Sequence, residues 1–252
     1  MNRIRRIPFV LFALLLAAQV FAQQAARQAD SSLLTLDTIF SYGARSLGWH
    51  QWQADGSGYL MLEPSSANRG ALDLVRYDAA SGARTVLVAA QSLIPAGAPS
   101  PLVIEEFTLS ADNKRLLIFT NSARVWRSNT RGDYWVFELA SKKLQKLGGT
   151  AKPSSLMFAK FSPDATRVGY VRDNNIYVES LSDGKVAQLT NDGAQYTVNG
   201  TFDWVYEEEL FCRDGFRWSP DGKHCLLAIG RFRRQKVAGF KDLLCDRKPW
   251  SP

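Results

Sequence analysis

The sequence predicts an all-β protein, a β-propeller of about four four-stranded blades with a short helical insertion. Three observations lead to this fold class: a polar turn that recurs four times, an apolar run after each turn, and a further strand pair between successive turns. The turns start 57, 52 and 57 residues apart. A period of this length that holds two hairpins is typical of a propeller blade. A β-sandwich of unrelated hairpins is the alternative, and the in-phase turns favour the propeller.

The first element, residues 1–22, is predicted to be a cleaved secretory signal peptide. Arg3, Arg5 and Arg6 precede an apolar run over residues 8–18, and small residues lead to a cleavage point near Ala22. The run is too short to span a bilayer comfortably, so we expect removal rather than stable membrane insertion. The mature protein is therefore expected in the periplasm or outside the cell.

Residues 35–224 contain the repeated turns of the predicted propeller. Each turn has a polar start, an aspartate whose side chain can bond the backbone, and in most cases a Gly or Asn that tolerates positive φ. They are Gln53-Ala54-Asp55-Gly56-Ser57, Ser110-Ala111-Asp112-Asn113-Lys114, Ser162-Pro163-Asp164-Ala165-Thr166 and Ser219-Pro220-Asp221-Gly222-Lys223. Each one is expected to close a hairpin between two strands of a blade.

Further strand pairs lie between these hairpins and complete the four-stranded units. The predicted pairs are 72–77 with 84–88, 134–139 with 144–147, and 176–180 with 186–189. Their own turns are rich in Ser, Gly, Asp and Lys, as hairpin turns are.

An insertion over residues 192–215 interrupts the rhythm and carries three consecutive glutamates, Glu207, Glu208 and Glu209. Adjacent like charges repel each other, so a cationic partner would explain why they stand together. Two carboxylates and one further acceptor satisfy the three donors of a primary ammonium. A solvated acidic start of a helix is the structural alternative. A calcium site is disfavoured because the spacing matches no known calcium loop.

The net charge of +7 is concentrated at the two ends of the chain. The body is close to neutral, so the basic balance predicts no nucleic-acid partner. Residues 225–252 fit neither the composition nor the period of the body, and we interpret them as a truncated or frame-shifted reading. A genuine amphipathic basic tail that binds an anionic surface is the alternative.

The segment from Asn199 to Leu210, NGTFDWVYEEEL, followed by FRWSPDG, resembles the segment that defines the dipeptidyl peptidase IV group of serine peptidases. The resemblance extends through Asn174-Asn175-Ile176-Tyr177-Val178, Phe161-Ser162-Pro163-Asp164 and Val125-Trp126-Arg127, and covers about residues 35–224. It identifies the chain as the N-terminal propeller part of such a peptidase.

The resemblance implies an eight-bladed propeller that caps an α/β-hydrolase domain, of which this chain holds about half the blades. The implied activity is release of dipeptides with proline or alanine in second position from peptides with a free N-terminus. Glu208 and Glu209 would hold the substrate ammonium, Arg127 the carbonyl of the first residue, and Glu207 would face elsewhere. A homodimer is a further expectation for the complete enzyme. Without the resemblance, Arg127 reads equally well as a surface residue beside Arg124 and Arg131.

No catalytic residue is predicted within the 252 residues. They contain no G-x-S-x-G nucleophile elbow, and the sequence offers no plausible Ser and Asp partner for His50 or His224. The chain is therefore expected to be truncated before the catalytic domain and inactive alone. No metal and no cofactor is predicted. The alternative function is a stand-alone periplasmic propeller that binds peptide amines or protein partners.

Overall fold

The computed structural model describes residues 35–41, 50–227 and 229–231, which fall in two compact units, Met1–Gly48 and Trp49–Pro252. In the first unit the described part is helix α2 (Leu36–Ser41) with the residue before it. The predicted signal peptide, residues 1–22, lies outside the described residues, and so does the predicted tail from residue 232 onward. Within the described ranges, no helix has the length and apolar character needed to cross a membrane.

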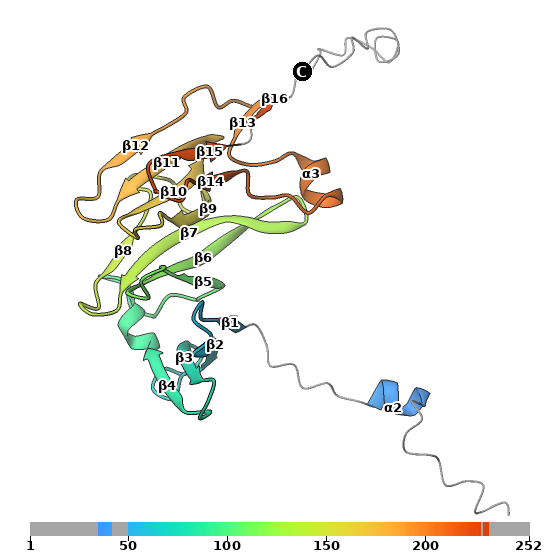
Figure 1. Ribbon diagram of the computed structural model, residues 1–252, viewed down its shortest axis with the longest axis vertical. Coiled ribbons are helices and arrows are strands. Elements are labelled where there is room, and N and C mark those ends of the chain that lie inside the picture. Colours follow the sequence, from blue (N-terminus) through green and yellow to red (C-terminus); the bar gives the residue numbers. More distant parts are fainter. Residues whose placement is uncertain (1–34, 42–49, 228, 232–252) are drawn as a thin grey trace, which may run out of the picture. The chain divides into compact units, whose positions relative to one another are not determined.

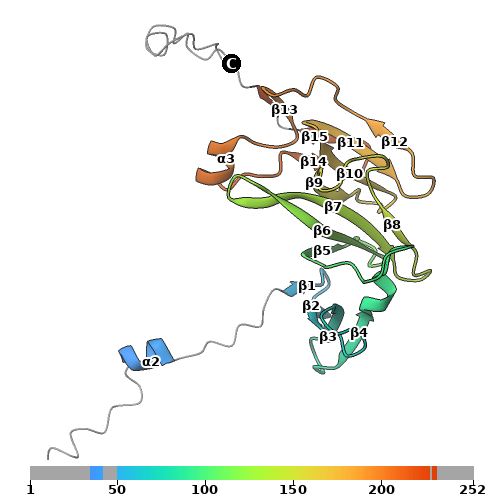
Figure 2. The same ribbon diagram turned by 180° about the vertical axis from the view of Figure 1, so that it is seen from behind.

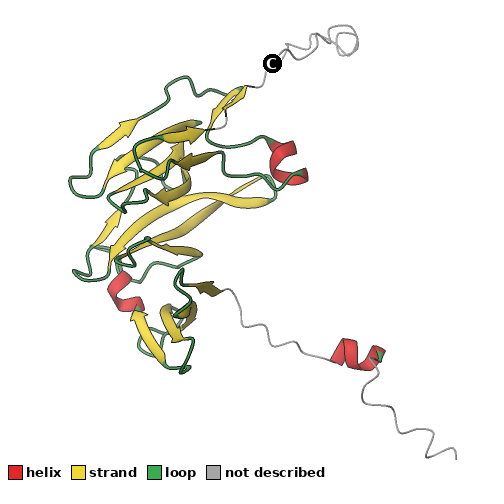
Figure 3. Ribbon diagram, in the orientation of Figure 1, coloured by secondary structure: helices red, strands yellow, loops and turns green. Residues whose placement is uncertain are grey.

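The second unit is made mostly of antiparallel strands, which confirms the all-β prediction (Figures 1 and 3). Its first blade is a four-stranded sheet whose strands follow each other in chain order. These strands are β1 (His50–Trp52), β2 (Gly58–Pro64), β3 (Leu72–Asp78) and β4 (Arg84–Val88). A 3-10 helix, η1 (Ala90–Leu93), leads from this blade to the next.

The second and third blades form one continuous sheet, because strand β7 pairs with β9 as well as with β6 and β8. The second blade contains β5 (Glu106–Leu109), β6 (Arg115–Val125), β7 (Ser128–Glu138) and β8 (Leu144–Lys146). The third contains β9 (Leu156–Phe161), β10 (Arg167–Arg172), β11 (Asn175–Ser180) and β12 (Val186–Gln188). The three predicted strand pairs correspond to β3–β4, β7–β8 and β11–β12.

The fourth blade is described in part, as two separate strand pairs. A helix follows its first strand in sequence. Strand β14 (Phe216–Trp218) pairs with β15 (Cys225–Leu227), and β13 (Thr197–Asn199) pairs with β16 (Ile229–Arg231). Helix α3 (Trp204–Glu209) lies in the loop that separates β13 from β14. Both strand pairs therefore use residues that follow position 224, where the atypical tail was predicted to begin.

The repeated turns have the side-chain chemistry that their sequence predicts. In the last three turns the serine Oγ donates to the aspartate Oδ1, and all four aspartates accept a backbone N–H two residues later. The bond from Ser162 helps to hold the pKa of Asp164 below its ordinary value. The fourth turn residue adopts positive φ every time, including Ala165, whose φ is +55°.

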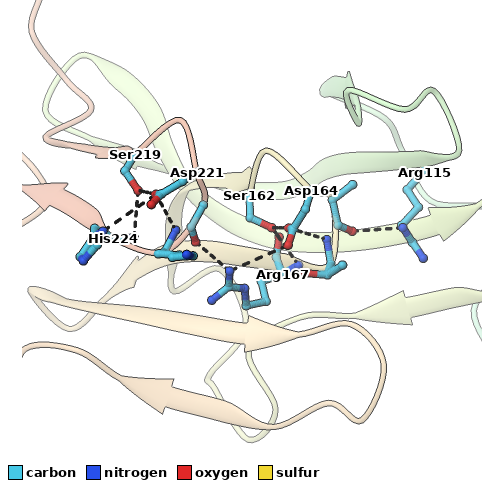
Figure 4. A network of polar contacts seen from close by, with 11 residues as sticks. Arg115, Ser162, Asp164, Arg167, Ser219, Asp221 and His224 are labelled. Atoms are coloured by element: carbon cyan, nitrogen blue, oxygen red, sulfur yellow. Dashed lines mark hydrogen bonds and ion pairs between the residues drawn. The ribbon is translucent and has the colours of Figure 1, made fainter.

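These turns also connect neighbouring blades through arginines at one repeated position, five residues after the serine (Figure 4). Arg115 donates to the carbonyl oxygen of Ala165 over 3.1 Å, and Arg167 donates to that of Gly222 over 2.7 Å. Each arginine thus ties the start of one blade's second strand to the turn of the next blade. Charge-assisted hydrogen bonds of this kind fix the register between adjacent blades.

The hydrophobic core lies between adjacent blades. Side chains of the first blade, such as Leu60 and Leu74, are buried against Ile118 and Phe137 of the second. A second cluster joins the second and third blades around Tyr170, and a smaller one joins the third blade to Phe216 of β14. Among the described residues, the buried clusters join neighbouring blades, as expected for a propeller.

Candidate functional site

The acidic triplet lies on helix α3, which follows an aspartate cap and is itself followed, after its C-cap Leu210, by a residue with positive φ. The Asp203 carboxylate accepts the backbone N–H of Tyr206 over 2.9 Å, as an N-cap residue does. Phe211, with φ at +55°, terminates the helix. A bridge between Thr201 and Asp214 closes the base of the loop. The sequence therefore forms one short helix that is anchored at both ends.

A long hairpin formed by β6 and β7 reaches from the second blade to this helix (Figures 1 and 2). Its pairing register shifts twice, between Thr120 and Ala123 and again before Val125, which indicates bulges that redirect the strands. Val125 pairs with Ser128, so Trp126 and Arg127 form the two-residue tip, with Trp126 at φ +50°. The bulges and the tight turn bring Arg127 to the helix.

Arg127 and Glu208 form an ion pair in which the Arg127 Nε lies 2.9 Å from Glu208 Oε2. The Glu208 side chain is only 6% exposed, whereas that of Arg127 is 73% exposed. The second carboxylate oxygen of Glu208, Oε1, is buried and has no hydrogen-bond partner among the described residues. Arg127 thus orients a carboxylate that keeps one acceptor oxygen unused.

The other two glutamates lie in different surroundings. Glu209 is exposed, and among the described residues it makes no ion pair. Glu207 is 3% exposed, and its Oε1 is also buried without a partner. Burial raises the pKa of the Glu207 carboxyl above its ordinary value, and the nearby charge of Arg213 opposes this shift. Two of the three predicted site residues, Arg127 and Glu208, are therefore in contact, and Glu209 stands free beside them.

Unsatisfied polar atoms and exposed apolar side chains gather around the helix. Of five buried side-chain atoms that lack a partner in the described part of the chain, four belong to Thr130, Asn199, Glu207 and Glu208. Large apolar side chains on the helix and just beyond it are 46% to 82% exposed. They are Trp204, Val205, Tyr206, Leu210 and Phe211. Buried acceptors without donors are costly, so this region is suited to receive N–H groups from a ligand.

Sequence reasoning did not identify the burial of Glu207 or the part played by the hairpin tip. The three residues are all glutamates and adjacent, so their sequence does not distinguish them. Their surroundings differ because consecutive side chains leave a helix about 100° apart. Nothing in the sequence around Trp126, apart from its place before Arg127, predicts that this residue lies at a hairpin tip. No group of three His, Cys, Asp or Glu side chains that could hold a metal ion occurs in the described ranges.

Comparison with known proteins shows which family this chain is similar to. Residues 110–241 match the family model described as "Dipeptidyl peptidase IV (DPP IV) N-terminal region". "Dipeptidyl aminopeptidase B" of Saccharomyces cerevisiae is 40% identical over 141 residues, which are 55% of this chain and 16% of that protein. "Probable dipeptidyl-aminopeptidase B" of Paracoccidioides brasiliensis is 30% identical over 209 residues, 76% of this chain and 22% of that protein.

A solved structure is similar as well. The crystal structure of Porphyromonas gingivalis dipeptidyl peptidase 4 has a TM-score of 0.62 and 29% sequence identity, and the match covers 75% of this chain and 26% of that one. The chain therefore spans roughly a quarter or less of the length of the proteins that it matches.

Proposed function

Because the chain belongs to the dipeptidyl peptidase IV N-terminal region family, we propose that it is the substrate-recognition propeller of a serine-type dipeptidyl peptidase. Such an enzyme releases dipeptides from peptides with a free N-terminus, with proline or alanine in the second position. The propeller recognises the terminus, and a hydrolase domain of the same enzyme supplies the nucleophile. The names of the relatives, which are dipeptidyl aminopeptidases and a dipeptidyl peptidase, support peptides as substrates.

The observation that carries this proposal is the buried, oriented carboxylate of Glu208. Its Oε2 is paired with Arg127 at 2.9 Å, and its Oε1 has no partner among the described residues. A substrate ammonium supplies the missing donor, and the exposed carboxylate of Glu209 can close on a second N–H. Only a charged amine repays the desolvation of this carboxylate, so an acylated terminus is rejected.

Arg127 has a second role in the proposal. The ion pair uses its Nε, and its side chain is 73% exposed, so the two Nη groups are accessible to a carbonyl oxygen of the bound peptide. A carbonyl held there and an ammonium held by Glu208 define the position of the first residue. Anchoring the terminus at a fixed distance from a nucleophile makes cleavage occur after two residues.

Titration calorimetry of the full chain with the tripeptide Ala-Pro-Ala and its N-acetylated form tests this function. We expect the free peptide to bind and the acetylated form to bind at least about tenfold more weakly, since it lacks the charged donor. The double variant E208Q/E209Q should bind the free peptide more weakly than the unmodified chain by about the same factor. E106Q, at an exposed glutamate outside the helix, is the matched control and should bind like the unmodified chain. Equal binding of both peptides would contradict the proposal.

The same proposal places the protein in the periplasm or outside the cell. It rests on the basic and apolar N-terminal residues and on the small residues that end at Ala22. N-terminal sequencing of the exported protein checks it, with a first residue shortly after Ala22 as the expected result. A mature protein that retains Arg3, Arg5 and Arg6 would argue against cleavage.

A further inference from the structure

A pocket of about 450 Å³ lies beside the Arg127–Glu208 pair but does not include it. Its walls come from the tip of the β6–β7 hairpin, the start of β9, the turn between β10 and β11, and the segment from Gln195 to Glu207. Figures 1 and 2 show that the hairpin tip and α3 adjoin in both views. Neither Arg127, Glu208 nor Glu209 lines this pocket. The pocket is therefore distinct from the ion pair, and Glu207 is the one glutamate of the triplet that lines it.

Glu207 is the group in this pocket that needs a partner. The residue is 3% exposed, and its Oε1 is buried with no hydrogen-bond donor in the described part of the chain. Burial raises the pKa of Glu207 and the charge of Arg213 opposes this shift, yet the two residues form no ion pair. A buried carboxylate without a donor costs free energy, and a cation in the pocket that contacts this carboxylate would recover part of it.

The remaining walls suit an organic cation. Two further acidic residues, Asp173 and Asp203, line the pocket with one basic residue, Arg131, so the balance of lining residues is negative. Trp126, which is 46% exposed, also lines the pocket, and an indole ring is the aromatic group that attracts cations best. Amide side chains and apolar groups complete the lining, which fits a ligand with N–H donors and a short carbon body.

We propose that this pocket is a second cation site, which binds a guanidinium or alkylammonium group with the Glu207 carboxylate as its anchor. Consecutive residues of a helix point about 100° apart, so Glu207 and Glu208 serve two different sites from one short helix. The ligand comes either from a basic side chain of a peptide or from a free small amine. The site does not depend on Glu208 binding a peptide terminus.

Methyl NMR of the full chain gives a local readout of this pocket. The sequence has three methionines, Met1, Met61 and Met157, of which Met157 lines the pocket and Met61 lies on β2 of the first blade. With methionine methyl groups labelled by ¹³C, methylguanidinium chloride should cause a saturable shift of the Met157 signal and leave Met61 in place. Sodium chloride at equal ionic strength is the control, and Met157→Leu assigns the signal.

The variants test the anchor of this site. E207Q should weaken methylguanidinium binding at least about tenfold, because it removes the charge that anchors the ligand. E106Q, at an exposed glutamate that does not line this pocket, is the matched control and should change that binding less than about twofold. The Met61 signal reports whether E207Q is folded. Trp126→Ala gives a second reading, with a loss of about threefold from the missing aromatic face.

Peptides identify the source of the cation. If it is a peptide side chain, Arg-Pro-Ala should bind more tightly than Ala-Pro-Ala, and E207Q should remove that difference. If it is a free small amine, the two peptides should bind equally while methylguanidinium still shifts Met157. No saturable shift with methylguanidinium or butylammonium, or an unchanged shift in E207Q, would overturn the proposal. Loss of the peptide terminus site alone would leave the methylguanidinium result intact.

Discussion

Replacing Glu207 with glutamine is expected to raise the free energy of unfolding of the chain by about 2 kcal/mol at pH 7 in buffer free of organic amines. Glu207 is 3% exposed and its Oε1 is buried without a donor, so folding removes this part of the carboxylate from water without a compensating hydrogen bond. The amide has nearly the same shape and carries no charge. Urea unfolding of both proteins measures the difference. A less stable E207Q variant would show that the ionised carboxylate is compensated.

The stability difference between E207Q and the unmodified chain should increase with pH. Burial raises the pKa of Glu207 in the folded chain. Below the unfolded pKa of about 4.3 the group is neutral in both states, so the variant and the unmodified chain should be equally stable. The unmodified chain loses stability as the pH rises through the raised folded pKa, and the difference is complete above it. An organic cation should shrink the difference at pH 7, because it binds the chain that retains Glu207 more tightly and stabilises it more than the variant.

Glu179 provides the matched control for this prediction. It is also 3% exposed and burial also raises its pKa, but its Oε2 accepts the backbone N–H of Gly148 over 2.8 Å and the hydroxyl of Tyr170 over 3.3 Å. E179Q should therefore lower the free energy of unfolding, since it disturbs acceptors that are in use. Opposite signs for the two variants would identify the missing donors, rather than burial itself, as the cause.

Substitution of Gly132 by alanine should destabilise the chain by about 3 kcal/mol. Gly132 lies on β7 where that strand also pairs with β9, opposite Leu156. A Cβ atom at this position would lie 2.8 Å from Phe119 Cζ and 2.8 Å from the carbonyl oxygen of Thr120. The strand must move to relieve these contacts, and with it the base of the hairpin that carries Arg127. The variant should therefore also lose affinity for free peptide termini.

Chemical unfolding measures the free energy lost in G132A, alone and combined with Phe119→Leu. The comparison tests whether the Phe119 ring causes the loss. The smaller side chain at position 119 removes part of the overlap, so the alanine should cost less in that background. Additive costs would mean that the ring is not responsible. A cost below about 1 kcal/mol in the single variant would show that the strand adapts without strain.

The blades are the part of the fold that sequence reasoning recovers. A turn such as Ser162-Pro163-Asp164 acts through bonds between near neighbours, and a short apolar run follows it, so local rules are sufficient. The sequence does not predict the hairpin that carries Arg127. The apolar run of β6 ends before Asn121, which adopts φ +49°, and nothing local indicates that the strands continue beyond this residue to residue 125.

The repeated blades, the family resemblance and the selection of Glu208, Glu209 and Arg127 as site residues follow from the amino-acid sequence. The contact of Arg127 with Glu208, and the burial of Glu207 beside a pocket, become visible in the folded chain. The difference arises from distance along the chain. Turn and strand preferences act over a few residues, whereas these contacts depend on bulges, strand register and the docking of one blade on the next.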